Sequence, residues 1–187
     1  MGLALLLVFG MRALNHLRTM EYARHHAFAF GQTDVTAVRS WMSMRFVASA
    51  YAVPEPYLYE SLNIDPSHFR DDLPLRFINA RQGWGTSPNG DYPAIIDKIQ
   101  AAILAYQEKP VATGLDRVEP WMSVRYAAHA TGIPEDDLLA ALQLDAALAA
   151  VPMDKAARDG RWPGGSKALA AAVEQAIQAL APQQEQP

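Results

Sequence analysis

The chain has 187 residues, half of them apolar, a formal net charge of −4 and no cysteine. An apolar fraction of this size supports a packed core and excludes a wholly disordered chain. The absence of cysteine excludes disulfides and cysteine-ligated metal sites, and the acidic balance argues against a broad nucleic-acid footprint. Alanine and leucine dominate, whereas β-branched runs are scarce, so the chain is predicted to be all-α.

The first segment, residues 1–32, is apolar at its start and basic afterwards. Residues 1–11 carry no charged side chain, and Arg12, Arg18 and Arg24 follow. A full span needs about 20 apolar residues. The segment is therefore interpreted as the inner half of a truncated membrane anchor, as an interfacial helix or as a core helix. The basic flank favours the membrane anchor and predicts that the rest of the chain faces the cytoplasm.

Residues 38–65 align without a gap to residues 118–145. Of these 28 positions 12 are identical, which indicates an internal duplication. Weaker similarity extends the two predicted repeats to residues 33–109 and 110–181, and the tail, 182–187, is predicted to be disordered. The identical residues of the first copy are Val38, Trp41, Met42, Ser43, Arg45, Ala48, Ala50, Pro54, Glu55, Leu58, Leu62 and Asp65.

Each repeat is predicted to contain four helices. Ser43 and Ser123 are suited to cap the first helix, because a serine hydroxyl accepts a backbone N–H that has no partner within the helix. Pro54 and Pro134 mark the start of the second helix, and a further proline precedes the third. The fourth carries an apolar stripe at helical spacing. The stripes are Ile95, Ile99, Ala102, Ile103 and Tyr106 in the first repeat and Leu169, Val173, Ala176, Ile177 and Leu180 in the second.

The turn after the first helix differs between the repeats. In the second repeat the helix is predicted to end at Gly132, since glycine takes the left-handed backbone conformation without strain. The first repeat has Ala52 there, and an alanine in that conformation costs about 1 kcal/mol. The turn of the first repeat is therefore predicted to be built differently.

The stretch VRYAAHATGIPEDDLLAAL, residues 124–142, resembles the helix-turn-helix pattern, as does MRFVASAYAVPEPYLYESL, residues 44–62. The resemblance covers about twenty residues of each repeat and is shared by many three-helix folds. It implies two tandem helix-turn-helix-like units after the N-terminal apolar helix.

In DNA-binding members of this class the second helix lies in the major groove. Here the second helices open with Glu55-Pro56 and with Glu135-Asp136-Asp137, and neither holds a lysine or arginine. Carboxylates at these positions repel phosphates, and they stabilise a helix N-terminus without DNA. Nucleic-acid binding is therefore not predicted. The alternative is a basic face assembled from Arg39, Arg45, Arg76 and Arg81.

Six repeated side chains form the candidate interaction surface. The two tryptophans either form a recognition surface or anchor the core, and the anchor is favoured. The two arginines either bind an anion or pair with the repeated carboxylates, glutamate or aspartate, and pairing is favoured. The six residues are Trp41, Arg45, Glu55, Trp121, Arg125 and Glu135.

Nothing in the sequence has the spacing of a catalytic, metal or cofactor site. The two capping serines have no histidine at the same distance in both repeats, since only the second has His129. The stretch GWGTSPNG, residues 83–90, lacks the lysine and the spacing of a phosphate-binding loop, so a loop with Trp84 packed over the unit is predicted. His25-His26 are adjacent and point to different sides of a helix. No cofactor and no metal is predicted.

The sequence as a whole predicts a non-enzymatic, bacterial-type, membrane-anchored protein. Its two repeats would face the cytoplasm and act by binding a protein partner or a second copy. The negative charge and the repeated apolar helices favour this hypothesis. The alternatives are a soluble cytoplasmic helix-turn-helix regulator that binds DNA and an enzyme with a site between the repeats.

Overall fold

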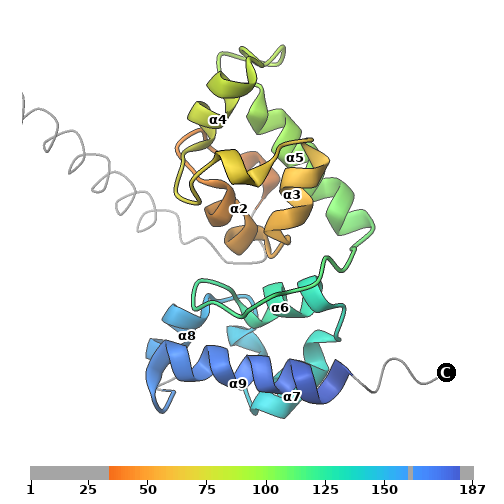
Figure 1. Cartoon of the computed structure of the whole chain (residues 1–187), viewed down its shortest axis with the longest axis vertical. Coiled ribbons are helices and arrows are strands. Elements are labelled where there is room, and N and C mark those ends of the chain that lie inside the picture. Colours follow the sequence, from red (N-terminus) through yellow and green to blue (C-terminus); the bar gives the residue numbers. More distant parts are fainter. Residues whose placement is uncertain (1–33, 160–161, 182–187) are drawn as a thin grey trace, which may run out of the picture.

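The computed structural model describes residues 34–159 and 162–181, which form helices joined by loops (Figure 1). No β-strand is present in these residues, only isolated bridges between extended segments. The all-α prediction is confirmed. The α-helices are α2 (Met44–Tyr51), α3 (Glu55–Ser61), α4 (Leu75–Gln82), α5 (Ile95–Glu108), α6 (Val124–Thr131), α7 (Glu135–Leu142), α8 (Met153–Asp159) and α9 (Gly165–Leu180). Short 3-10 turns are η1 (Val35–Ala37), η2 (Pro66–His68) and η3 (Ala146–Leu148).

The helices lie in two groups along the long axis of the molecule. Figure 1 shows α2 to α5 toward one end and α6 to α9 toward the other, with α6 at the boundary. We call residues 34–109 the first group and residues 110–181 the second group. Within each group the last helix packs across the others, since α5 contacts α3 and α4, and α9 contacts α6, α7 and α8.

Serine side chains begin the first helix of both groups. The Ser43 hydroxyl accepts the Phe46 backbone N–H at 3.1 Å, and the Ser123 hydroxyl accepts the Tyr126 backbone N–H at 3.0 Å. The two N-caps predicted from the sequence are confirmed. Ser123 is fully buried, so water cannot replace its hydroxyl as the acceptor.

The start of the first helix is tied to the start of the third helix in the same way in both groups. The Leu75 N–H donates to the Met42 carbonyl at 2.8 Å, and the Met153 N–H donates to the Met122 carbonyl at 2.8 Å. An isolated antiparallel bridge lies beside each of these bonds. The residues that the sequence alignment pairs therefore make the same backbone contacts.

The turn after α2 has the left-handed backbone conformation, although a different turn was predicted there because Ala52 stands in place of a glycine. Ala52 has φ 51° and ψ 37°, close to Gly132 with φ 74° and ψ 6°. The prediction of a differently built turn is wrong. Ala52 is 1 % exposed, and its carbonyl lies 2.6 Å from Nδ1 of His129. Packing and this bond from the second group outweigh the roughly 1 kcal/mol of backbone strain.

The fourth helices bury their apolar stripes to different extents. In α5 the stripe from Ile95 to Tyr106 is buried along its whole length. In α9 only the first half is buried, through Leu169, Ala170 and Val173, whereas Leu180 near the end is half-buried. The end of α9 therefore keeps apolar surface partly open to solvent.

Within the described residues, no helix combines the length and apolar character that crossing a membrane requires. The predicted N-terminal anchor, residues 1–32, and the predicted disordered tail, residues 182–187, lie outside the described residues. The anchor therefore stays a prediction.

Candidate interaction surface

Three of the six predicted residues, Arg45, Glu55 and Trp121, come together where the two groups meet. Nε of Arg45 on α2 lies 3.7 Å from Oε2 of Glu55, the first residue of α3. Nη2 of Arg45 lies 2.5 Å from Oδ2 of Asp71. The guanidinium carbon is 5.1 Å from the centroid of the Trp121 ring, within cation–π range. The predicted Arg45–Glu55 pair is confirmed, and Asp71 is a partner that the sequence did not indicate.

Burial dominates the electrostatics of this cluster. The Glu55 side chain is only 14 % exposed, and among the described residues the buried Nε of Arg45 has no hydrogen-bond partner. Burial raises the pKa of the Glu55 carboxyl, which Arg45 opposes and Asp71 reinforces. Burial also raises the pKa of Tyr59 to about 12, with a contribution from the Glu55 charge. The cluster thus joins the mostly buried Glu55 to Arg45, whose side chain is 37 % exposed, and to the exposed Asp71.

Arg125 and Glu135 form a separate pair in the second group. Nε and Nη2 of Arg125 lie 2.6 Å and 3.1 Å from the two carboxylate oxygens, so the contact is bidentate. The hydrogen bond to Glu135 raises the pKa of Arg125, against the effect of burial. The predicted pairing is confirmed with glutamate. Asp65 and Asp145 instead accept backbone N–H groups two residues further on.

Both tryptophans are half-buried against the core. The ring of Trp41 lies 5.5 Å from that of Phe46, and the ring of Trp121 meets Tyr126 edge-on at 5.1 Å. These contacts fit the predicted role as core anchors. Trp121 has a second role, since it also lies under the guanidinium of Arg45.

Hydrogen bonds join α2 and the start of α3 to α6 and to Trp121, which precedes α6. The Ser49 hydroxyl donates to the Trp121 carbonyl at 3.0 Å. The Glu55 backbone N–H donates to the Tyr126 hydroxyl oxygen at 3.0 Å. The first backbone N–H of α3 is therefore bonded to a side chain of the second group.

His129 completes this junction. Its Nδ1 lies 2.6 Å from the Ala52 carbonyl, so this nitrogen carries the proton. Its ring lies 5.8 Å from that of Tyr106, which Tyr57 meets edge-on at 4.9 Å. The sequence indicated no contact partner for His129. The available signal was that this position changes from Ser49 to histidine between the two aligned segments, although residues on either side of it, Ala48 and Ala50, are identical in both.

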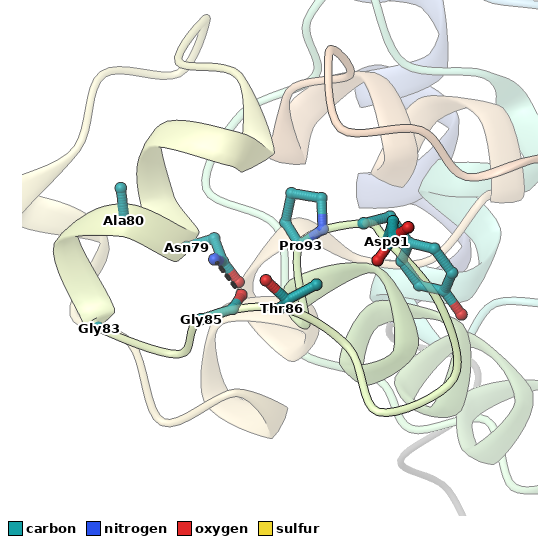
Figure 2. A pocket seen from close by; sticks show the side chains of 8 residues that line it. Asn79, Ala80, Gly83, Gly85, Thr86, Asp91 and Pro93 are labelled. Carbon is teal, nitrogen blue, oxygen red and sulfur yellow. Dashed lines mark hydrogen bonds between the residues drawn. The ribbon is translucent and has the colours of Figure 1, made fainter.

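The glycine-rich stretch after α4 forms a loop beside an open pocket of about 550 Å³ (Figure 2). The Asn79 amide donates to the Gly85 carbonyl at 2.8 Å and accepts the Ile95 N–H at 2.9 Å, so it holds the loop to the start of α5. Thr86 and Asp91 are exposed at the pocket. The lining residues are Asn79, Ala80, Gly83, Gly85, Thr86, Asp91, Tyr92 and Pro93.

Trp84 packs back against the core as predicted, and Nζ of Lys98 lies 4.9 Å from its ring centroid. Lys98 is thus placed on an aromatic face. In the parts of the chain that the structure describes, no group of three histidine or carboxylate side chains is placed to hold a metal ion.

The chain matches no protein-family model, no curated protein and no solved structure. Among the contacts of the described residues, those at the junction between the two groups link the most distant parts of the chain.

Proposed function

We propose that this protein is a non-enzymatic, membrane-anchored scaffold whose two helix-turn-helix-like units bind another protein in the cytoplasm. The junction carries this proposal. The turn after α2 and the start of α3 hold α6 through Ala52 and Glu55, and Ser49 of α2 holds the residue Trp121 before α6. The first group thus already binds a helix, α6, on this surface. Binding of a helix to a protein surface is a recurrent mode of peptide recognition.

Matched contacts support the interpretation of the two groups as tandem copies of one unit. The serine caps of α2 and α6 are alike, and so are the backbone bonds that tie Leu75 to Met42 and Met153 to Met122. The turns at Ala52 and Gly132 share the left-handed conformation. If the two groups are copies of one unit, the second group is predicted to have a surface of the same shape as the one that binds α6 in the first group.

The DNA-binding alternative is less well supported by these contacts. A recognition helix contacts base edges through its N-terminal residues. The first backbone N–H of α3, that of Glu55, is bonded to Tyr126, and the first turn of α7 carries three carboxylates. In the proposed basic face, Arg45 is paired with two carboxylates, and Arg39 donates to backbone carbonyls.

Fluorescence anisotropy with a labelled random DNA duplex tests this alternative. Binding through phosphates weakens steeply between 50 and 200 mM salt. We expect no binding by the full-length protein at either salt concentration. A salt-dependent rise in anisotropy would replace the protein-binding proposal with the DNA-binding one.

Membrane fractionation of the full-length protein tests the anchor. We expect the protein in the membrane fraction and the Leu6→Arg variant largely in the soluble fraction, because an arginine at a helix centre costs about 2.5–3.5 kcal/mol on insertion scales. Leu104→Arg is the matched control, since Leu104 is 52 % exposed on α5, and it should not change the fractionation. A wild-type protein in the soluble fraction would contradict the anchor.

A further inference from the structure

The turn between the first two helices is buried in the first group and open in the second. Ala52 is 1 % exposed and Pro54 is buried, whereas Gly132 and Pro134 are both exposed. The backbone is alike at the two turns, with ψ 129° at Pro54 and 134° at Pro134. The second group therefore presents to solvent the surface that the first group covers with α6.

The contacts that cover the first turn are made mainly to backbone groups. The Tyr126 hydroxyl binds a backbone N–H, and the His129 ring binds a backbone carbonyl. These two residues are three positions apart on α6, so their side chains lie on one face of the helix. Because the second turn has the same backbone conformation, a helix of similar pattern fits there as well.

The side chains beside the second turn differ from those beside the first, so a helix that binds there needs different side chains. Where the first group has Pro56 and Tyr57, the second group has Asp136 and Asp137, both exposed. The ring of His129 lies against that of Tyr106, which belongs to the first group. The residue of α9 that matches Tyr106 is Leu180. The second surface is thus more acidic and lacks the aromatic ring that receives the imidazole. A cation fits at this position better than a neutral histidine.

Apolar residues lie near the second turn and at the end of α9. Val111 in the segment between the groups is 46 % exposed, and its neighbour Ala112 lies 3.3 Å from the place of a Cβ on Gly132. Leu180 is half-buried at the end of α9. An apolar segment at Gly132, with two exposed carboxylates four and five residues further along the chain, suits an amphipathic helix that has an apolar face and a charged edge.

We propose that the turn surface of the second unit, formed by Gly132, Pro134, Asp136 and Asp137, binds a helix of a partner protein. The helix carries a tyrosine and, three residues further on, an arginine or lysine. The tyrosine takes the place that Tyr126 has on the first unit, and the cation faces Asp137. This inference rests on the proposed protein-binding function and names the surface and the chemistry of the partner.

Photo-crosslinking in cells that express the full-length chain tests the proposal. The crosslinking residue p-benzoylphenylalanine replaces Ala140, which is exposed one turn after Asp136 on α7 and leaves the turn surface intact. A second chain carries it at Ala80, exposed on α4, as the reference position. The crosslinked peptides are identified by mass spectrometry, and the yields at the two positions are compared.

We expect a peptide of another protein at position 140 with tyrosine and a basic residue three apart. Asp137→Arg should lower its yield at least tenfold, and Asp136→Arg provides a second variant at the same surface. Glu60→Arg is the matched control, because it makes the same charge change at an exposed position of α3, and it should leave the yield unchanged. Circular dichroism melting of each variant confirms that the fold is kept.

Other outcomes overturn the inference in distinct ways. A crosslinked peptide from this chain itself would mean that a second copy or its own N-terminal segment occupies the surface. A yield that Asp137→Arg leaves unchanged, or a partner without the basic residue, would contradict the stated chemistry. Crosslinks to a protein at position 80 alone would keep the proposed function and reject this surface. No crosslink to any protein at either position would reject both.

Discussion

The Glu55 backbone N–H donates a hydrogen bond to the Tyr126 hydroxyl oxygen at 3.0 Å, across 71 residues of chain. Tyr126 is 2 % exposed, and burial raises the pKa of its hydroxyl to about 12. The hydroxyl is therefore neutral at physiological pH and is a permanent part of the contact. One side chain thus links the start of α3 to α6 and occupies the backbone N–H of Glu55.

Removal of that hydroxyl is expected to destabilise the protein. Tyr126→Phe keeps the ring but leaves a covered N–H without its acceptor, which costs about 1–3 kcal/mol. The free energy of unfolding from urea titrations measures the loss. Tyr57→Phe is the control, because among the described residues no hydrogen bond involves the Tyr57 hydroxyl. Equal effects of the two substitutions would contradict the role given to the Tyr126 hydroxyl.

The serine caps should contribute measurably and unequally. Ser43→Ala and Ser123→Ala each remove the acceptor for the N–H of the third residue of a helix, at a cost of about 0.5–2 kcal/mol. The loss should be larger at Ser123, which is fully buried, than at the half-buried Ser43. Urea titration of both variants checks the order. Ser61→Ala, at an exposed position within α3, should be nearly neutral.

The parts of the fold that follow local rules were predictable from the sequence. A serine before an apolar-periodic segment predicts a cap wherever it occurs, and both Ser43 and Ser123 cap their helices. The stripe of α5 was likewise visible as a period of helical spacing. These features depend on neighbours within one or two turns, which a single sequence contains.

The parts that depend on distant contacts were not predictable. The strain at Ala52 is offset by His129, 77 residues away, and no local pattern indicates that bond. Asp71 was missed for the same reason, since it reaches Arg45 across 26 residues from a loop. Only the aligned copies gave a signal, through the change from Ser49 to His129, and that signal did not specify a partner.

Two glycines at helix ends separate backbone strain from side-chain contact. Gly83 and Gly132 have φ 67° and 74°, so alanine at either position costs about 1 kcal/mol in backbone strain. A Cβ at Gly83 meets nothing within 4 Å, whereas one at Gly132 meets Ala112 at 3.3 Å. Gly132→Ala should therefore lower the free energy of unfolding more than Gly83→Ala does. The reverse order would show that the segment at Ala112 moves aside freely.

The free energy of unfolding should depend on pH through the carboxyl group of Glu55. Burial raises the pKa of this carboxyl above the 4.5 of an ordinary glutamate. The folded protein therefore binds the proton more tightly than the unfolded chain, and this contribution is lost as pH rises from 4.5 through the folded pKa. Glu55→Gln stays neutral, so across this window wild-type stability should fall relative to the variant. Urea titrations at a series of pH values measure the difference.

Asp97 provides the control of opposite sign. Hydrogen bonds from Ser87 and Tyr92 lower the pKa of its carboxyl below 3.8. Its stabilising contribution is present above that value and is lost as pH falls through the folded pKa. The free energy of unfolding of the wild type, compared with that of Asp97→Asn, should therefore fall as the pH is lowered. Compared with that of Glu55→Gln, it should fall as the pH is raised toward neutral. Slopes of the same sign for both variants would contradict the assignment, because only a buried carboxyl that prefers its proton reverses the usual acid dependence.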